Sequence, residues 1–225
     1  MKSHLNNEKL GLIIAAGGTG NRYSKQKYKL FEKLNNTPLF IITLKNFIDI
    51  LPEENIILVI NKDFENHFKE NLKLHLPNKT IKLIYGGIDR MHSVYNGLQA
   101  LPKSIEYVAV HDAARPYASG TLLKRCFETA ANFGSAIPAK RVTDTLKIAN
   151  DKNVVKQTLN REQIWAVETP QVFKIKELIK AYTQAFKEKF SGTDDASVME
   201  NAGYRPYLLE NSDTNIKITY ERDII

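Results

Sequence analysis

The sequence predicts an α/β fold in which a mostly parallel, twisted sheet is flanked by helices. Short apolar runs bounded by turn residues recur along the chain, and longer stretches with helical spacing separate them. Strands of a parallel sheet are buried on both faces and are therefore apolar throughout, as these runs are. The chain has 225 residues, 43% of them apolar, which is enough to bury a large core. We expect residues 1–225 to form a single domain.

Strands and helices are expected to alternate over the first part of the chain. The expected strands are 10–16 (LGLIIAA), 55–60, 81–85, 107–112 and 135–139. The expected helices run from Leu39 to Ile48, Phe64 to Leu74, His92 to Leu101 and Leu122 to Asn132. In such sheets, ligands bind beyond the carboxyl ends of the strands. We therefore expect functional residues in segments 15–20, 86–89 and 111–115.

A β-hairpin is expected where this alternation stops, near Val142. Segments 143–149 (TDTLKIA) and 154–160 (VVKQTLN) read as two strands joined by NDKN, giving an arm at about 142–161. A lone two-stranded hairpin is marginally stable in water. We therefore expect its apolar side chains to pack against another chain; these are Leu146, Ile148, Val154 and Leu159.

The last part of the chain is expected to contain a helix, a polar turn and two strand-like runs. The helix covers 174–190, the turn is SGTDDAS, and the runs are 205–210 and 215–219. Asp194 and Asp195 have the residue type that caps a following helix. Trp165 and Phe173 are interpreted as core residues.

Composition and charge exclude several function classes. The net charge is +7, but most lysines are scattered through helical stretches, where a solvated face is the simpler explanation. No stretch interleaves basic and aromatic residues and no zinc-finger spacing occurs, so nucleic-acid binding is not expected. No apolar run approaches about 18 residues, so no membrane span is expected. The N-terminus has no signal-peptide core.

The single cysteine, Cys126, lies in a helical context and is interpreted as a buried apolar residue rather than a nucleophile. One cysteine cannot form an internal disulfide, which fits a reducing cytoplasm. His92 and His111 lack metal-ligand spacing and are interpreted as structural.

A glycine-rich loop follows the first expected strand. Glycines let backbone N–H groups approach a phosphate closely, because no side chain is in the way. The loop lacks the Gly-Lys-Ser/Thr of a P-loop and the third glycine of a dinucleotide-binding turn, where Tyr23 stands instead. It is followed by the cations Arg22 and Lys29, which can neutralise phosphate oxygens. This combination indicates nucleotidyl transfer rather than γ-phosphate hydrolysis.

Nearly the whole chain resembles the 2-C-methyl-D-erythritol 4-phosphate cytidylyltransferase family. The family's motifs occur in order as AAGGTGNR, YGGIDRMHSVYNGL, VHDAARPY, VTDTLK, NREQIW, ETPQVF, TDDASVMENAG and NIKIT. The sequence departs from the family in three places. The glycine loop carries one extra residue, Tyr28-Lys29-Leu30 replaces Pro-Lys-Gln, and Ile88 replaces an acidic residue. If Lys29 is not the phosphate lysine, Lys27 and Lys25 are the alternatives.

The resemblance implies a Rossmann-like nucleotidyltransferase fold and a CTP-dependent transfer. A phosphate oxygen of the polyol phosphate attacks the α-phosphorus of CTP, and pyrophosphate leaves. That oxygen is already ionised, because the second pKa of a phosphate monoester is about 6, so no general base is needed. Catalysis is then mostly positioning and charge neutralisation by Mg²⁺ and cationic side chains. By resemblance, Arg22 and Lys29 contact the triphosphate, and Arg161 and Lys217 contact the incoming phosphate.

The resemblance also implies the binding residues. The CTP site comprises Ala15, Ala16, Gly17, Gly18, Thr19, Gly20, Gly87, Ser93, Asp112 and Ala113. The polyol phosphate site comprises Asp112, Arg115, Thr145, Arg161, Thr169, Thr193 and Lys217. Asp112 is the expected Mg²⁺ ligand; a helix cap or a salt bridge to Arg115 is the structural alternative. The threonines would otherwise be ordinary strand or cap residues.

A homodimer is also implied, in which the arm exchanges and brings Arg161 and Thr145 to the partner's site. Three other functions remain open at the level of sequence. The nearest is a ribitol 5-phosphate cytidylyltransferase, although HDAARP and TDDAS favour the methylerythritol family. The others are a catalytically silent binding protein and, from charge alone, a nucleic-acid binder.

Overall fold

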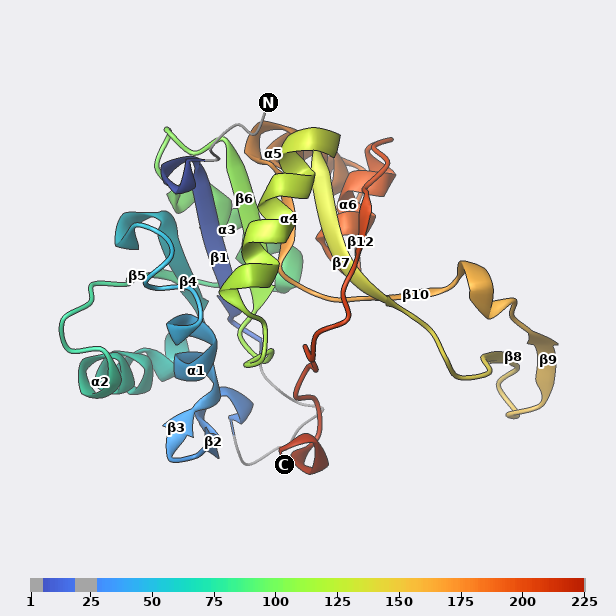
Figure 1. The fold of residues 1–225 in the computed structure, drawn as a ribbon, viewed down its shortest axis with the longest axis horizontal. Coiled ribbons are helices and arrows are strands. Elements are labelled where there is room, and N and C mark those ends of the chain that lie inside the picture. The colour runs from blue at the N-terminus through green and yellow to red at the C-terminus, as the bar shows by residue number, and fades with distance from the viewer. Residues whose placement is uncertain (1–5, 19–27, 225) are drawn as a thin grey trace.

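The computed structural model describes residues 6–18 and 28–224. Its main sheet has the strand order β10-β7-β11-β6-β1-β4-β5, and β12 also pairs with β7 (Figure 1). The strands of this sheet are β1 (Leu10–Ala16), β4 (Ile56–Ile60), β5 (Lys82–Tyr85), β6 (Tyr107–Asp112), β7 (Ser135–Arg141), β10 (Trp165–Val167), β11 (Gln171–Lys174) and β12 (Leu208–Glu210). The predicted α/β fold with a mostly parallel sheet is confirmed.

Four strands, β6, β1, β4 and β5, form a parallel unit whose carboxyl ends are aligned. Ala15 lies opposite Asp112 across β1 and β6, and Ala16 lies opposite Ile60, which in turn lies opposite Tyr85. β11 extends the sheet antiparallel to β6 and β7. The residues that follow β1, β4, β5 and β6 are therefore brought to one edge, as the sequence predicted for a ligand site.

Helices cover both faces of the sheet. They are α1 (Leu39–Lys45), α2 (Glu65–His75), α3 (Arg90–Ala100), α4 (Gly120–Phe133), α5 (Ile175–Lys187) and α6 (Asp195–Asn201). One core contains side chains of α1, α2 and α4 packed on the sheet, and a second contains those of α3, α5 and α6. Cys126 is fully buried in the first core, where burial raises the pKa of its thiol to about 12, so the interpretation as an apolar core residue is confirmed.

The segment 142–164 leaves the main sheet. β8 (Lys147–Ala149) and β9 (Val155–Thr158) pair antiparallel in a two-stranded sheet of their own. Figure 1 shows this hairpin at the end of two extended segments, apart from the helices and the main sheet. The side chains of Ile148, Val154 and Val155 are 42%, 58% and 55% exposed within the single chain.

Some expected elements differ from those observed. The run 205–210 contains β12, but 215–219 forms no strand. That segment is held by individual hydrogen bonds instead: Asn215 Nδ2 donates to the carbonyl of Thr169, and the N–H of Ile218 donates to the carbonyl of Ala114. Phe173 is buried as predicted, whereas Trp165 is only half-buried and its ring carries the guanidinium of Arg141 at 4.3 Å.

Two other short strands, β2 (Lys33–Leu34) and β3 (Thr37–Pro38), form a small separate sheet. Their turn residues, Asn35 and Asn36, both have positive φ, a conformation that asparagine tolerates better than most residues. This hairpin follows the 3-10 helix Lys29–Phe31 and precedes α1.

Candidate active site

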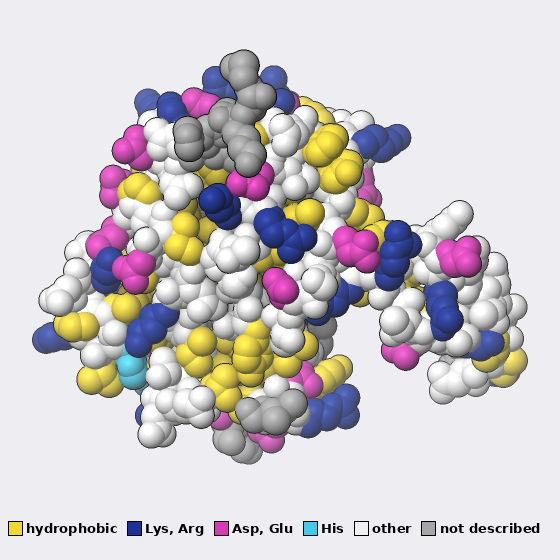
Figure 2. All heavy atoms as spheres, viewed as in Figure 1, with side chains coloured by type: hydrophobic (Ala, Val, Ile, Leu, Met, Phe, Trp, Pro, Cys, Tyr) yellow, Lys and Arg dark blue, Asp and Glu magenta, His cyan; other side chains and the backbone are white. Residues whose placement is uncertain are grey.

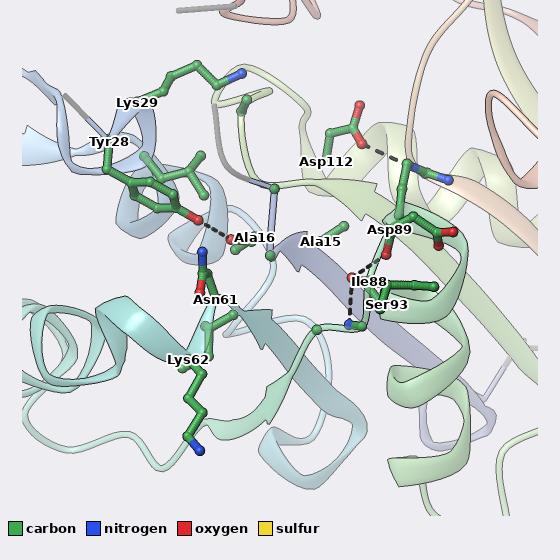
Figure 3. Close-up of a pocket in the computed structure, with 18 of the residues that line it drawn as sticks. Ala15, Ala16, Tyr28, Lys29, Asn61, Lys62, Ile88, Asp89, Ser93 and Asp112 are labelled. Carbon is green, nitrogen blue, oxygen red and sulfur yellow. Dashed lines mark hydrogen bonds and ion pairs between the residues drawn. The ribbon is translucent and has the colours of Figure 1, made fainter. Parts of the chain in front are cut away.

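A cavity of about 560 Å³ lies at the carboxyl ends of β1, β4, β5 and β6. Its volume is typical of a small-ligand site. Its walls come from the start of the glycine loop, the turn after β4, the turn between β5 and α3, the end of β6 and the segment 217–219 (Figure 3). Several residues predicted from the sequence line it, namely Ala15, Ala16, Gly17, Gly18, Lys29, Gly87, Ser93, Asp112 and Lys217.

The turn between β5 and α3 forms one wall. The N–H of Gly87 donates to Ser93 Oγ at 3.1 Å, and the hydroxyl of Ser93 donates to the carbonyl of Asp89 at 2.7 Å. Asp89 caps α3, and its carboxylate accepts from the N–H of His92 at 2.8 Å. Because Ser93 Oγ retains a second acceptor lone pair, it can still accept a hydrogen bond from a ligand.

Gly87 is required at its position by packing. A Cβ added there would lie 2.3 Å from His92 Cβ and 3.1 Å from the backbone carbon of His92. Ile88 follows, and its side chain is 90% exposed at the mouth of the cavity. It therefore offers an apolar surface at the position where the resemblance in the sequence implies an acidic residue.

Asp112 is a buried carboxylate surrounded by three cations. Lys217 Nζ lies 2.7 Å from Oδ2 and Arg115 Nε 3.7 Å from it, and an Arg90 nitrogen lies 3.8 Å from Oδ1. Burial alone would raise the pKa of Asp112. Lys217 and Arg90 outweigh it and hold that pKa well below its usual range, so the carboxylate stays ionised.

His111 and Thr169 hold the backbone of Asp112 in place through hydrogen bonds. The N–H of Asp112 donates to Thr169 Oγ1 at 3.1 Å, and that hydroxyl is 2.9 Å from His111 Nδ1. Burial lowers the pKa of His111 to about 4, so its ring is neutral near pH 7. A neutral ring can accept from Thr169 and donate through Nε2 to the carbonyl of Arg115, 3.3 Å away. The structural interpretation of His111 is confirmed.

Tyr28 and Lys29 border the cavity on the other side of β1 from Asp112 (Figure 3). The hydroxyl of Tyr28 donates to the carbonyl of Ala16 at 2.6 Å, and its ring stacks on Phe64 with centroids 4.2 Å apart. Burial raises the pKa of Tyr28, so the hydroxyl remains a donor. Tyr28 therefore ties the residue before Lys29 to the end of β1.

Other predicted residues do not line the cavity. Arg115 donates to the carbonyls of Asn215 at 2.7 Å and Val167 at 3.5 Å, so its side chain links these two segments to the end of β6. The remaining ones are Ala113 and Thr169, which are buried, Thr193, which is exposed, and Thr145 and Arg161 in or beside the hairpin. Within its own chain, Arg161 donates to the carbonyl of Thr143. Thr19, Gly20 and Arg22 lie outside the described residues.

The sequence did not identify Arg90, and it misjudged Asp195. Asp194 caps α6 as predicted, with a reciprocal bond to Ser197. Asp195 instead turns inward and is fully buried, with its Oδ2 2.7 Å from Arg90. One local signal could have found Arg90: it is the first residue of a helix, where the helix dipole disfavours a cation unless a carboxylate compensates it.

Comparisons with known proteins were made for the whole chain. Residues 10–225 match the family model described as 2-C-methyl-D-erythritol 4-phosphate cytidylyltransferase. The chain belongs to this family. The protein of this name from Bacillus velezensis is 40% identical over 215 residues, covering 95% of this chain and 92% of the relative. The one from Geobacillus thermodenitrificans is 39% identical over 213 residues, with the same coverage.

A solved structure is similar throughout. The crystal structure of 4-diphosphocytidyl-2C-methyl-D-erythritol synthase from Anaerococcus prevotii has a TM-score of 0.82 and 30% identity, and covers 97% of this chain and 96% of that one. The resemblance found in the sequence is therefore confirmed, and the chain is a CTP-dependent cytidylyltransferase. The findings favour methylerythritol phosphate over ribitol 5-phosphate as the acceptor, and an enzyme over a silent binding protein.

Charged side chains of both signs are mixed on the surface of the protein. On the face shown in Figure 2, Lys and Arg side chains are dispersed among Asp and Glu, without a continuous basic stripe. This distribution is typical of a solvated surface.

Among the described residues, no helix is long and apolar enough to cross a membrane.

The donor set at Asp112 fits Mg²⁺ in the way that nucleotide enzymes hold it. No group of three or more His, Cys, Asp or Glu side chains suited to a metal occurs within 6–18 and 28–224. Mg²⁺ is commonly held by one or two carboxylates together with substrate phosphates and water. Asp112 supplies one carboxylate at the cavity wall, and Oδ1 is the oxygen farther from its nearest cation.

Proposed function

We propose that this cavity is where the cytidylyl group of CTP is transferred to 2-C-methyl-D-erythritol 4-phosphate. The observation that supports the proposal is the ionised carboxylate Asp112 with Lys217 and Arg90 beside it, at a cavity that Lys29 also borders. Such a site matches a reaction between two anions, which needs positioning and charge neutralisation more than acid–base chemistry.

In the proposed reaction, an ionised oxygen of the methylerythritol phosphate forms a bond to the α-phosphorus of CTP. The bond from that phosphorus to the bridging oxygen of pyrophosphate breaks, and the oxygen leaves with the electron pair. No proton has to move, since the nucleophile is ionised near neutral pH. Mg²⁺ held by Asp112 and the triphosphate would supply further positive charge at the leaving group.

The cytosine is proposed to lie against the turn between β5 and α3. Gly86 and Gly87 let this turn pack closely against Ser93 and His92, and Ser93 Oγ has one remaining acceptor lone pair. An amino group such as that of cytosine is a suitable donor to it. The base would then stack beneath the exposed side chain of Ile88.

The phosphates are proposed to lie between the glycine loop and Lys217. Lys29 is assigned to the triphosphate together with Arg22. Lys217 is bound to Asp112 in the free protein and is assigned to the incoming phosphate. Its exchange of partners is favourable because a phosphate dianion carries more charge than one carboxylate and Asp112 keeps Arg90 and Arg115 as neighbours.

The test of the proposed function is pyrophosphate release from CTP with different acceptors. We expect turnover with 2-C-methyl-D-erythritol 4-phosphate and at least about 10-fold lower kcat/KM with ribitol 5-phosphate, as for a substrate that leaves polar groups unpaired. Equal or faster turnover of ribitol 5-phosphate contradicts the proposed acceptor. Activity that survives removal of divalent cations contradicts the proposed role of Mg²⁺.

We further propose a homodimer in which the hairpin 142–161 completes the partner's site. The support is its exposure: Ile148, Val154 and Val155 are apolar and uncovered in the single chain, and Arg161 does not line its own cavity. An isolated hairpin with such side chains gains stability when a second copy covers them. Arg161 would then act on the phosphate bound by the partner.

Mixed dimers test this arrangement. Lys29→Ala and Arg161→Ala are each expected to inactivate the enzyme. Co-refolded in equal amounts, half of the dimers are mixed and each mixed dimer has one intact site, so about a quarter of wild-type activity should return. A mixture that stays inactive, although mixed dimers are shown to form, means that Arg161 acts in its own chain.

A further inference from the structure

A series of contacts connects the cavity to the packing of α3, α5 and α6. Tyr182, on α5, donates its hydroxyl to Asp195 Oδ1 at 2.5 Å. Asp195 Oδ2 accepts from Arg90, the first residue of α3, at 2.7 Å. The same terminal nitrogen of Arg90 is 3.8 Å from Asp112 Oδ1. Tyr182 and Asp195 lie outside the cavity wall, while Arg90 and Asp112 are part of it.

The inner half of this series is buried and fully paired. The side chain of Asp195 has no exposed surface, and Tyr182 is also fully buried. A buried carboxylate is stable only when its oxygens are paired, and here each oxygen has its own partner. Burial raises the pKa of Tyr182 well above its usual value, and Asp195 raises it further, so the phenol remains a donor.

Arg90 is held in a single place by that pair. Burial opposes its charge, but Asp195 and then Asp112 outweigh burial and raise the pKa of Arg90 above its usual value. Its side chain is 29% exposed, toward the cavity. The short contact indicates that Asp195 anchors the guanidinium, and the longer one indicates that Asp112 is the carboxylate on which the guanidinium acts.

The cations around Asp112 are divided between its two oxygens. Lys217 and Arg115 both face Oδ2, whereas Arg90 faces Oδ1. In the proposed function, Lys217 leaves Asp112 for the incoming phosphate. Arg90 cannot follow, since Asp195 retains it, so one side of Asp112 keeps its neighbour throughout the reaction.

We propose that Arg90, anchored by Asp195 and Tyr182, is a positioning residue that orients the Asp112 carboxylate toward the substrates. The inference rests on the proposed function, in which Asp112 contacts the reacting groups. It gives the DRMHSV and TDDAS segments a shared role, because together they join α3 to α6 and hold Asp112 in a fixed orientation.

The test is a double-mutant cycle between Arg90 and Asp112. Arg90→Gln would leave Asp195 as a buried unpaired charge, so the variant used is Arg90→Gln with Asp195→Asn, which removes both charges. We expect it to fold and to lower kcat about 10- to 100-fold, as for a misplaced catalytic group, with KM for CTP nearly unchanged. Arg90→Lys, which keeps the charge, should recover part of kcat.

The cycle separates positioning from a structural role. In an Asp112→Asn background, activity is measured in single-turnover assays at high enzyme concentration. There the same pair of substitutions should lower the single-turnover rate by less than about 3-fold. Equal losses in both backgrounds, or full activity of the folded pair variant, would overturn the inference. The pair of substitutions leaves the net charge unchanged, so the matched control is Lys9→Gln with Glu106→Gln, which removes an exposed ion pair just before β1 and β6; thermal unfolding controls for folding.

Tyr182→Phe keeps the inference testable if the pair variant does not fold. This substitution removes only the hydroxyl that holds Asp195. A loss of kcat when residue 112 is aspartate, with no loss in the Asp112→Asn variant, supports the inference. An equal loss in both backgrounds contradicts it. Asp112→Asn by itself reports on the proposed function. If that variant is fully active, the reaction is not placed at Asp112; if it is inactive and the losses are additive, only the role of Arg90 fails.

Discussion

Gly87 provides the most direct test of how the cavity wall is built. A Cβ at this position would lie 2.3 Å from His92 Cβ and within 3.1 Å of the His92 backbone, so Gly87→Ala requires the wall and the first turn of α3 to separate. That turn is anchored by the Asp89 cap and by the ion pair of Arg90 with Asp195. Gly18→Ala is the matched control, because a Cβ added at Gly18, in the same cavity, would meet nothing within 4 Å.

The expected magnitude follows from the contacts. Overpacking against atoms that cannot rotate away costs about 1–3 kcal/mol, and each kcal/mol lowers Tm by about 2–4 °C in a chain of this size. Gly87→Ala should therefore unfold about 2–12 °C below the wild type, and its KM for CTP should rise because Ser93 moves with the turn. Gly18→Ala should keep the wild-type Tm.

Thermal unfolding followed by circular dichroism, together with pyrophosphate release at varied CTP, measures both effects. A wild-type Tm for Gly87→Ala would show that α3 moves freely and that our account of its anchoring is wrong. A lowered Tm with an unchanged KM for CTP would support the packing at Gly87 but show that the turn does not contribute to binding the base.

Four other outcomes are expected. Lys29→Ala should lower kcat about 10²–10³-fold by removing charge near the leaving group, and near-normal kcat would exclude Lys29 as the phosphate lysine. Tyr28→Phe keeps the stacked ring and should cost about 1 kcal/mol in denaturant unfolding for the lost bond to Ala16; no loss would contradict this. Ile88→Asp should raise the preference for CTP over UTP in kcat/KM, and an unchanged ratio would refute a role in base choice. For His111, whose folded pKa of about 4 lies below 6.5, the unfolded chain takes up the proton first, so stability should fall by up to about 3 kcal/mol as pH drops from 6.5 to 4; His111→Gln should remove that part of the slope.

Local features of the sequence were sufficient for the fold class and most elements. Apolar runs and helical spacing depend on neighbours within a few residues, so they predicted β1, β4, β5 and β6 and the helices between them nearly in place. The glycine loop and the motifs around Asp112 and Gly87 likewise indicated a nucleotide site at the carboxyl ends of the strands. The short strands β10 and β11 were not predicted, because they are defined by pairing with β7 and β6 rather than by their own pattern.

The partners of the charged side chains were decided only by the tertiary structure. Lys217 and Asp112 are 105 residues apart in sequence, as are Arg90 and Asp195, and no local pattern encodes either contact. Asp195 illustrates the reason. Its residue type and position suit a helix cap, but the packing of α5 against α6 buries it, and a buried carboxylate must find a hydrogen bond and a cation. Composition and periodicity determine which segments are buried, whereas the need to pair each buried charge determines the site, and that need exists only once the segments are packed together.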